Sequence, residues 1–195
     1  MKIGLYFGSF NPIHIGHLLI ASYVANNTDV DQVWFILSPQ NPHKNSTTLL
    51  NEYQRLHLVQ LAIEPDDNQL KASDIEFKLP KPSYTINTLI YLNEKYPQYE
   101  FALIMGSDSF QNIHNWKNAE ALLKNYEFFI YQRKGFELKE TSLSKSKEAK
   151  ITLLKAPLLE ISATEIRNLI KEGKTIRYLV PEKIREEIEK SRYYK

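Results

Sequence analysis

The residues best suited to chemistry lie in one stretch, Tyr6 to Ala21, with the sequence YFGSFNPIHIGHLLIA. Within it stand Gly8, His14, Gly16 and His17, although the chain has only 5 histidines and 6 glycines. Two ring N–H donors aimed at one point can stabilise the negative charge that builds on a phosphoryl group during its transfer. The spacing therefore predicts phosphoryl or nucleotidyl transfer without a covalent nucleophile.

The local backbone that this chemistry needs is a turn leading into a helix. If the turn is helical from about Ile13, the rings of His14 and His17 project to the same side. Gly16 between them would leave space for a phosphate, and Gly8 would adopt backbone angles closed to other residues. Free N–H groups at the helix start favour an anion. We therefore expect phosphate at this turn.

Other chemistries fit the same stretch less well. A zinc site of the His-Glu-x-x-His type needs a four-residue spacing and a base, which HIGH does not provide. The glycines do not form the G-x-G-x-x-G pattern of dinucleotide-binding turns. One histidine near a helix start is usually a surface or capping residue. The prediction thus depends on the pair and not on either histidine alone.

Composition limits the class of protein. With 195 residues, 43% of them hydrophobic, the chain is expected to form a single domain over residues 1–195. A formal net charge of +2 argues against nucleic acid or a membrane surface as partner. There is no cysteine, which excludes disulfides and thiolate chemistry, and no apolar segment approaches membrane-spanning length. We expect a soluble, cytoplasmic protein.

The elements that position the histidines follow an alternating pattern. Apolar segments of strand length, mostly apolar on both faces, alternate with segments of helical period. Strands are predicted at 2–7, 33–38, 100–105, 127–133 and 151–156. Helices are predicted at 15–26, 52–63, 85–95, near 116–124, and within the C-terminal part 163–190 at 163–172 and 182–190. The pattern predicts an α/β fold, a doubly wound and mainly parallel sheet with helices on both faces.

Two segments fit this pattern less clearly. Residues 70–79 are predicted to form one or two extended segments. Residues 134–150 are polar, rich in Ser and Lys and without period, so we expect a mobile segment there. In a doubly wound sheet, ligands bind where the first strand gives way to the first helix. The histidine stretch occupies that place.

A second motif, ISATEIR, begins at Ile161. Ser162 followed by Glu165 has the spacing of a capping box, which predicts a helix start. Capping does not explain Arg167, whose guanidinium in the first turns could form a bidentate clamp on a phosphate. By itself such an arginine is more often a solvated surface residue.

Both motifs resemble those of a known superfamily. GSFNPIHIGH resembles the G-x-F-x-P-x-H-x-G-H signature of the nucleotidyltransferases related to class I aminoacyl-tRNA synthetases, and ISATEIR looks like their I-S-x-T-x-x-R motif. Four further segments resemble the bacterial nicotinate-nucleotide adenylyltransferase family: NPHK (41–44), SYTINT (83–88), MGSDSF (105–110) with Trp116, and YLVPEKIREEI (178–188). The likeness runs nearly end to end.

The resemblance implies a Rossmann-like nucleotidyltransferase fold and an activity. The enzyme would transfer the adenylyl group of ATP to nicotinate mononucleotide, giving nicotinate adenine dinucleotide and pyrophosphate in NAD biosynthesis. Magnesium would be held mainly by the ATP phosphates, with no metal ligand from the protein. ATP and nicotinate mononucleotide would be the partners, and a homo-oligomer stays possible.

The resemblance also implies residue roles. Catalysis would fall to His14, His17, Lys44 and Arg167. ATP would be bound by Gly8, Ser9, Phe10, Gly106, Asp108, Ser162 and Thr164. The acceptor would be bound by Tyr84, Thr85 and Trp116, with the tryptophan stacked on the pyridine ring, although Thr85 could instead be a simple helix cap.

Departures and alternatives remain open at this point. Asn11 stands where the family usually has Asp, and NPHK replaces the commoner Pro-Pro-His-Lys. A sister adenylyltransferase acting on nicotinamide mononucleotide, phosphopantetheine or another phosphate acceptor would carry nearly the same motifs, and a non-catalytic nucleotide-binding regulator is a further alternative. The sequence leaves open the preference between the acid and the amide form of the pyridine and the oligomeric state.

Overall fold

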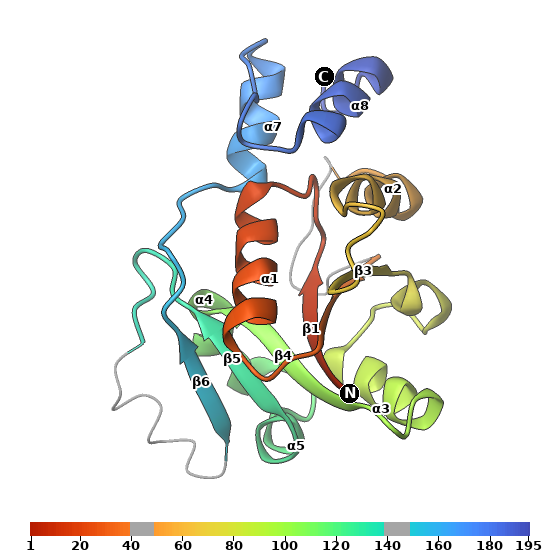
Figure 1. The fold of residues 1–195 in the computed structure, drawn as a ribbon, viewed down its shortest axis with the longest axis vertical. Helices are drawn as coiled ribbons and strands as arrows, with labels where there is room; N and C mark the ends of the chain where they lie inside the picture. The colour runs from red at the N-terminus through yellow and green to blue at the C-terminus, as the bar shows by residue number, and fades with distance from the viewer. Residues whose placement is uncertain (40–48, 139–148) are drawn as a thin grey trace.

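The computed structural model describes residues 1–39, 49–138 and 149–195 and contains one sheet. Its six strands are all parallel and lie in the order β3-β2-β1-β4-β5-β6 (Figure 1). The strands are β1 (Lys2–Gly8), β2 (Gln32–Leu37), β3 (Leu70–Ser73), β4 (Glu100–Gly106), β5 (Glu127–Tyr131) and β6 (Lys150–Leu154). The predicted doubly wound sheet is confirmed.

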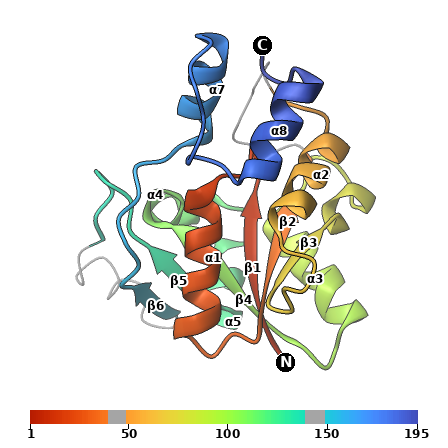
Figure 2. The ribbon, with the colours of Figure 1, turned by 45° about the horizontal axis from the view of Figure 1, so that its top comes forward.

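Helices cover both faces of this sheet. The α-helices are α1 (Ile15–Asn27), α2 (Glu52–Ala62), α3 (Thr85–Lys95), α4 (Ser107–Gln111), α5 (Ala119–Asn125), α7 (Ala163–Lys171) and α8 (Glu182–Ser191). Helices α1, α2 and α8 share one hydrophobic cluster with the sheet, and α3, α4 and α5 share the other. Helix α7 stands beyond the carboxyl ends of the strands (Figure 2).

The apolar character of the strands on both faces explains this layering. Along β4, Phe101 and Leu103 belong to the cluster under α3 and α5, whereas Ala102 and Ile104 belong to the cluster under α1. Successive side chains of a strand point to opposite faces, so a strand that is apolar throughout is stable only when helices cover both. The sheet therefore holds two cores, one on each side.

Several element boundaries differ from those predicted. Helix α1 begins at Ile15, as predicted, but the turn before it is not helical from Ile13, because His14 has extended backbone angles (φ −146°) and caps the helix. Asn118 adopts left-handed angles (φ 54°), which delays α5 to Ala119. Of the segment 70–79, residues 70–73 form β3 and Ile75–Lys78 form a 3-10 helix.

The predicted mobile segment 134–150 lies partly outside the described residues, since 139–148 are not described. Its first residues are described, and Lys134 forms an ion pair with Glu160 at 2.5 Å. Helices α7 and α8 are separate helices within the predicted C-terminal part. In the described part of the chain, no helix has the length and apolar composition needed to cross a bilayer.

The strand order places a crevice at the centre of the sheet. Strand β1 continues into α1 on one face, whereas its neighbour β4 continues into α4 on the other. The chain therefore leaves the two strands in opposite directions at their carboxyl ends. Ligands of doubly wound proteins bind at this position.

Candidate functional site

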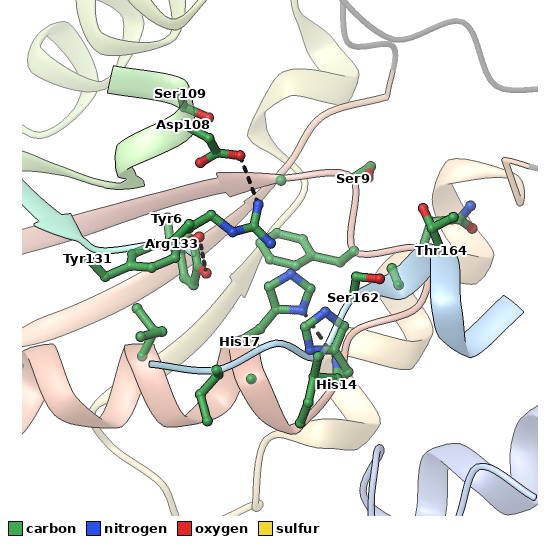
Figure 3. A pocket seen from close by; sticks show the side chains of 18 of the residues that line it. Tyr6, Ser9, His14, His17, Asp108, Ser109, Tyr131, Arg133, Ser162 and Thr164 are labelled. Atoms are coloured by element: carbon green, nitrogen blue, oxygen red, sulfur yellow. Dashed lines mark hydrogen bonds and ion pairs between the residues drawn. The ribbon is translucent and has the colours of Figure 1, made fainter. Parts of the chain in front are cut away.

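A cavity opens at the carboxyl ends of β1, β4 and β5 (Figure 3). Its walls come from the loop after β1, the start of α4, the residues after β5 and the turn before α7. The predicted site residues that line it are Gly8, Ser9, Phe10, His14, His17, Asp108, Ser162, Thr164 and Arg167. The two motifs, which lie far apart in the chain, thus face one cavity, as the proposed chemistry requires.

The two histidines form a stacked pair. Their ring centroids lie 3.7 Å apart with an interplanar angle of 26°. The backbone N–H of His14 donates to Nδ1 of His17 at 3.3 Å, and the ring of Phe10 contacts His17 edge-on with a centroid distance of 5.0 Å. Because Nδ1 of His17 accepts a hydrogen bond, the neutral ring carries its proton on Nε2. The packing therefore fixes both the orientation and the tautomer of His17.

The His14 imidazole is buried in the cavity wall, with 4% of the residue exposed. Burial, reinforced by the nearby Arg133 guanidinium, lowers the pKa of His14 to about 4. A Cβ at position 16 would lie 3.0 Å from Nδ1 of His14. Gly16 thus makes room for the imidazole, and because it also lines the first cavity, the space it leaves for a phosphate stays a prediction. At neutral pH His14 is an uncharged hydrogen-bonding group.

The loop after β1 uses its glycine in a different way from the one predicted. A Cβ on Gly8 would lie 2.8 Å from the ring of Phe10, so the glycine is needed for space. The left-handed backbone is at Phe10 (φ 44°), whose side chain is 1% exposed. The Phe10 ring belongs to the core, and only its backbone can approach a ligand. The Asn11–Pro12 peptide bond that follows is cis.

A buried arginine that the sequence reasoning missed supports this loop. The Arg55 guanidinium, on α2, donates to the backbone carbonyl oxygens of Ser9 (2.6 Å), Ser38 (3.0 Å), Leu50 (3.0 Å) and Pro39 (3.2 Å). It is fully buried. These bonds tie the loop after β1 to the end of β2 and the start of α2. The signal available in the sequence was a cationic residue on the apolar side of a predicted helix.

Arg133 is a second missed residue, and it lies inside the cavity. Its Nη1 donates to the Asp108 carboxylate at 2.9 Å, and its backbone N–H donates to the Ser107 hydroxyl at 2.9 Å. Figure 3 shows the guanidinium between Asp108 and the histidine pair. The other oxygen of Asp108, Oδ1, is buried with no hydrogen-bond partner among the described residues. The signal available in the sequence was the position of Arg133 at the carboxyl end of the strand predicted at 127–133.

The ISATEIR turn supplies the opposite wall. The Ser162 hydroxyl accepts a hydrogen bond from the Glu165 backbone N–H at 3.1 Å, which confirms the predicted N-cap of α7. Nη1 of Arg167 donates to the Asn11 carbonyl at 2.7 Å, and Nη2 donates to the Thr164 hydroxyl at 3.2 Å. The guanidinium is therefore held against the loop after β1, beside the cavity.

The side chain of Asn11, whose backbone carbonyl accepts from Arg167, is itself held by hydrogen bonds. It is 3% exposed, and its Oδ1 accepts hydrogen bonds from the Leu50 backbone N–H (3.2 Å) and the Tyr194 hydroxyl (2.9 Å). These two contacts need an oxygen acceptor and no negative charge. An amide in place of the usual carboxylate is sufficient for them.

A second cavity adjoins the first across the loop after β1. The lining residues that the two cavities share are Tyr6, Phe7, Gly8, Ser9, Ser38, Asp108, Ser109 and Tyr131. The predicted acceptor residues Tyr84, Thr85 and Trp116 all line the second cavity.

The structure changes the predicted assignments of Gly106 and Thr85. Gly106, which was grouped with the ATP-binding residues, lines the second cavity and not the first. Tyr84 is the N-cap of α3 and Thr85 its first residue, so Thr85 is not the helix cap. Asp108, by contrast, faces both cavities and could serve a ligand in either.

The remaining predicted site features concern charge. Lys44 lies outside the described residues. Among residues that the structure describes, no group of three His, Asp or Glu side chains could hold a metal ion. Arg133 and Arg167 line the first cavity with the two histidines, and this set suits a polyanion such as a triphosphate.

A family model, similar sequences and a solved structure all match this chain over most or all of its length. A family model described as Cytidylyltransferase-like matches residues 5–169. A Flavobacterium psychrophilum protein named "Probable nicotinate-nucleotide adenylyltransferase" is 53% identical over 195 residues, 100% of both chains. A Cytophaga hutchinsonii protein of the same name is 51% identical over 100% of this chain and 98% of its own. Nicotinic acid mononucleotide adenylyltransferase of Plasmodium falciparum, solved with NaAD, has the same fold (TM-score 0.84, 23% identity, 99% and 97% covered).

Proposed function

The chain belongs to the nicotinate-nucleotide adenylyltransferase family, and on that basis we propose that it transfers the adenylyl group of ATP to nicotinate mononucleotide. The products are nicotinate adenine dinucleotide and pyrophosphate. The observation that carries this proposal is the pair of adjoining cavities at the sheet's crevice. One is lined by histidines and arginines and the other by aromatic side chains, and a shared wall lies where the two substrates would meet.

The first cavity suits ATP. Ser162, Thr164 and Arg167 line this cavity and would hold the β and γ phosphates, which leave as pyrophosphate. His14 and His17 would lie at the α-phosphoryl group, where the stacked rings would donate hydrogen bonds to oxygens whose charge grows during transfer. Since His14 is neutral near pH 7, it acts as a hydrogen-bond donor and not as a cation.

Transfer is a single displacement at phosphorus. An oxygen of the acceptor's 5′-phosphate attacks the α-phosphorus of ATP, a new P–O bond forms, and the bond to the bridging oxygen of the β-phosphate breaks. The attacking phosphate is already ionised near neutral pH, so no general base is needed. Alignment of the two substrates can supply on the order of 7 to 11 kcal/mol of the barrier reduction.

The acceptor's ring would lie in the second cavity, on Trp116. This side chain is half-buried and lines the cavity together with Tyr84 and Thr85. An aromatic platform of this kind stabilises a planar ring through offset stacking. The acceptor's phosphate would then point toward the shared wall and the α-phosphorus.

We propose that magnesium enters this site with ATP. Magnesium usually binds through substrate phosphates, water and one or two carboxylates. Asp108 is a carboxylate that lines both cavities, and its unpaired Oδ1 fits a ribose hydroxyl or a water held by the ion. When bound, the ion would neutralise charge on the triphosphate. We also propose that the enzyme works in the cytoplasm, where ATP and pyridine nucleotides are available.

Pyrophosphate release tests the proposal. Purified protein with ATP and magnesium should release pyrophosphate with nicotinate mononucleotide faster than with phosphopantetheine or flavin mononucleotide. A preference for either of these, or ATP binding with no product from any acceptor, would show that the assignment is wrong.

His17→Ala tests the role of the histidine pair. Loss of one donor to the developing charge should reduce kcat about 100-fold or more. The midpoint of thermal unfolding should stay near that of the wild type, which would show that the fold is retained. Near-normal turnover in this variant would contradict the role given to His17.

A further inference from the structure

Few of the side chains that line the second cavity are charged, and they differ in sign. Among the described residues, its charged lining side chains are Glu76, Asp108 and Lys117. Asp108 is paired with Arg133, and the ion pair leaves little net charge there. Glu76 and Lys117 therefore decide the electrostatic character of the cavity toward a ligand.

Glu76 makes one side of the cavity unfavourable for an anion. It is 1% exposed, and its two carboxylate oxygens accept hydrogen bonds from the hydroxyl groups of Ser83 (2.7 Å) and Thr88 (2.8 Å). Burial raises the pKa of Glu76, whereas both hydrogen bonds favour its ionised form. Both oxygens already accept hydrogen bonds, so Glu76 offers no donor to a ligand carboxylate, which needs a cation elsewhere in the cavity.

Lys117 is the cationic side chain that lines this cavity in the described part of the chain. It directly follows Trp116, and its Nζ lies 4.7 Å from the centroid of the Tyr84 ring. A cation at this distance over an aromatic face is attracted to it, which keeps the ammonium group near the cavity. No described carboxylate forms an ion pair with Lys117, so its charge is available to a ligand.

We propose that Lys117 is a specificity-determining residue that pairs with the carboxylate on the acceptor's pyridine ring. The inference rests on the proposed function and refines it. Nicotinate and nicotinamide mononucleotides have nearly the same shape but differ in one group, a carboxylate against a neutral amide. An ammonium group offers three donors and no acceptor, so it pairs with the two charged oxygens of the carboxylate, whereas the neutral amide offers it a single carbonyl oxygen and no charge. Lys117 therefore favours the acid.

The acid-to-amide ratio of kcat/KM measures this preference. In Lys117→Met, kcat/KM for nicotinate mononucleotide should fall about fivefold, as for the loss of one partly exposed ion pair, and the value for the nicotinamide form should fall far less. Lys117→Arg should keep most of the ratio. Lys124→Met, on the exposed side of α5, is the matched control and should keep the wild-type ratio. The acid preference of the wild type should also weaken at high salt.

The outcomes separate this inference from the proposed function. If the wild-type protein makes the dinucleotide but Lys117→Met leaves the acid-to-amide ratio unchanged, the role of Lys117 is overturned and the proposed function is not. Main-chain groups would then discriminate between the two acceptors. An equal loss with both acceptors would show a general effect on the pocket and would also overturn it. Wild-type protein that accepts neither pyridine nucleotide would refute the proposed function, and the inference with it.

Discussion

The buried imidazole of His14 links the stability of this protein to pH. Its pKa is about 4 in the folded protein against 6.5 as a free side chain, chiefly because burial penalises the charged ring. Between these values the unfolded chain binds a proton that the folded protein does not. The free energy of unfolding therefore falls as the pH drops from about 6.5 toward 4, and the stabilisation is fully present only above 6.5.

The size of the effect follows from the two values. Each pKa unit corresponds to about 1.4 kcal/mol, so the full difference is roughly 3 kcal/mol. About 2 kcal/mol of this should be lost between pH 8 and pH 5, where the fold is still expected to be populated. For a protein of ordinary stability, that is a large fraction of the total.

The predicted loss of stability at low pH can be checked by urea unfolding of the wild type and of His14→Gln at pH 8, 6.5 and 5. All other titrating groups are common to both proteins, so the difference between their pH slopes isolates His14. We expect the wild type to lose about 2 kcal/mol more than the variant over this range. His57→Gln, at an exposed position of α2, is the matched control and should follow the wild type. Parallel curves for the wild type and His14→Gln would refute the reasoning.

Two further substitutions test the scaffold around the site. Arg55→Met should lower the free energy of unfolding by about 3 kcal/mol or more, because four carbonyl oxygens lose the buried guanidinium as their donor. A change below about 1 kcal/mol in urea titration would show that water replaces the guanidinium at little cost. Ser162→Ala removes the side-chain cap of α7 and should cost about 1 kcal/mol, measured in the same way. Unchanged stability would mean that the cap does not form in solution.

Local sequence was sufficient to predict much of the fold. The alternation of apolar strands and periodic helices predicted the parallel sheet and most element boundaries to within a few residues. Ser162 was expected to cap a helix, and it does. Periodicity and capping depend on residues close together in the chain, so they can be read without knowledge of the tertiary structure.

The chemistry of the site was also evident from the sequence, but only as two separate motifs. The spacing of His14 and His17 indicated phosphoryl transfer, and Arg167 indicated a phosphate clamp. Nothing in either motif required them to meet. Their common cavity arises because α7 stands beyond the carboxyl end of β1, where Arg167 donates to the loop that follows the strand.

Only the tertiary structure decided what the small residues and the buried cations do. Gly8 and Gly16 make room for the rings of Phe10 and His14. Arg55 meets backbone carbonyl groups, whereas Arg133 meets a carboxylate in the cavity. The physical reason is that steric fit, desolvation and hydrogen-bond pairing depend on neighbours distant in the chain, whereas helix and strand preferences depend on residues a few positions away.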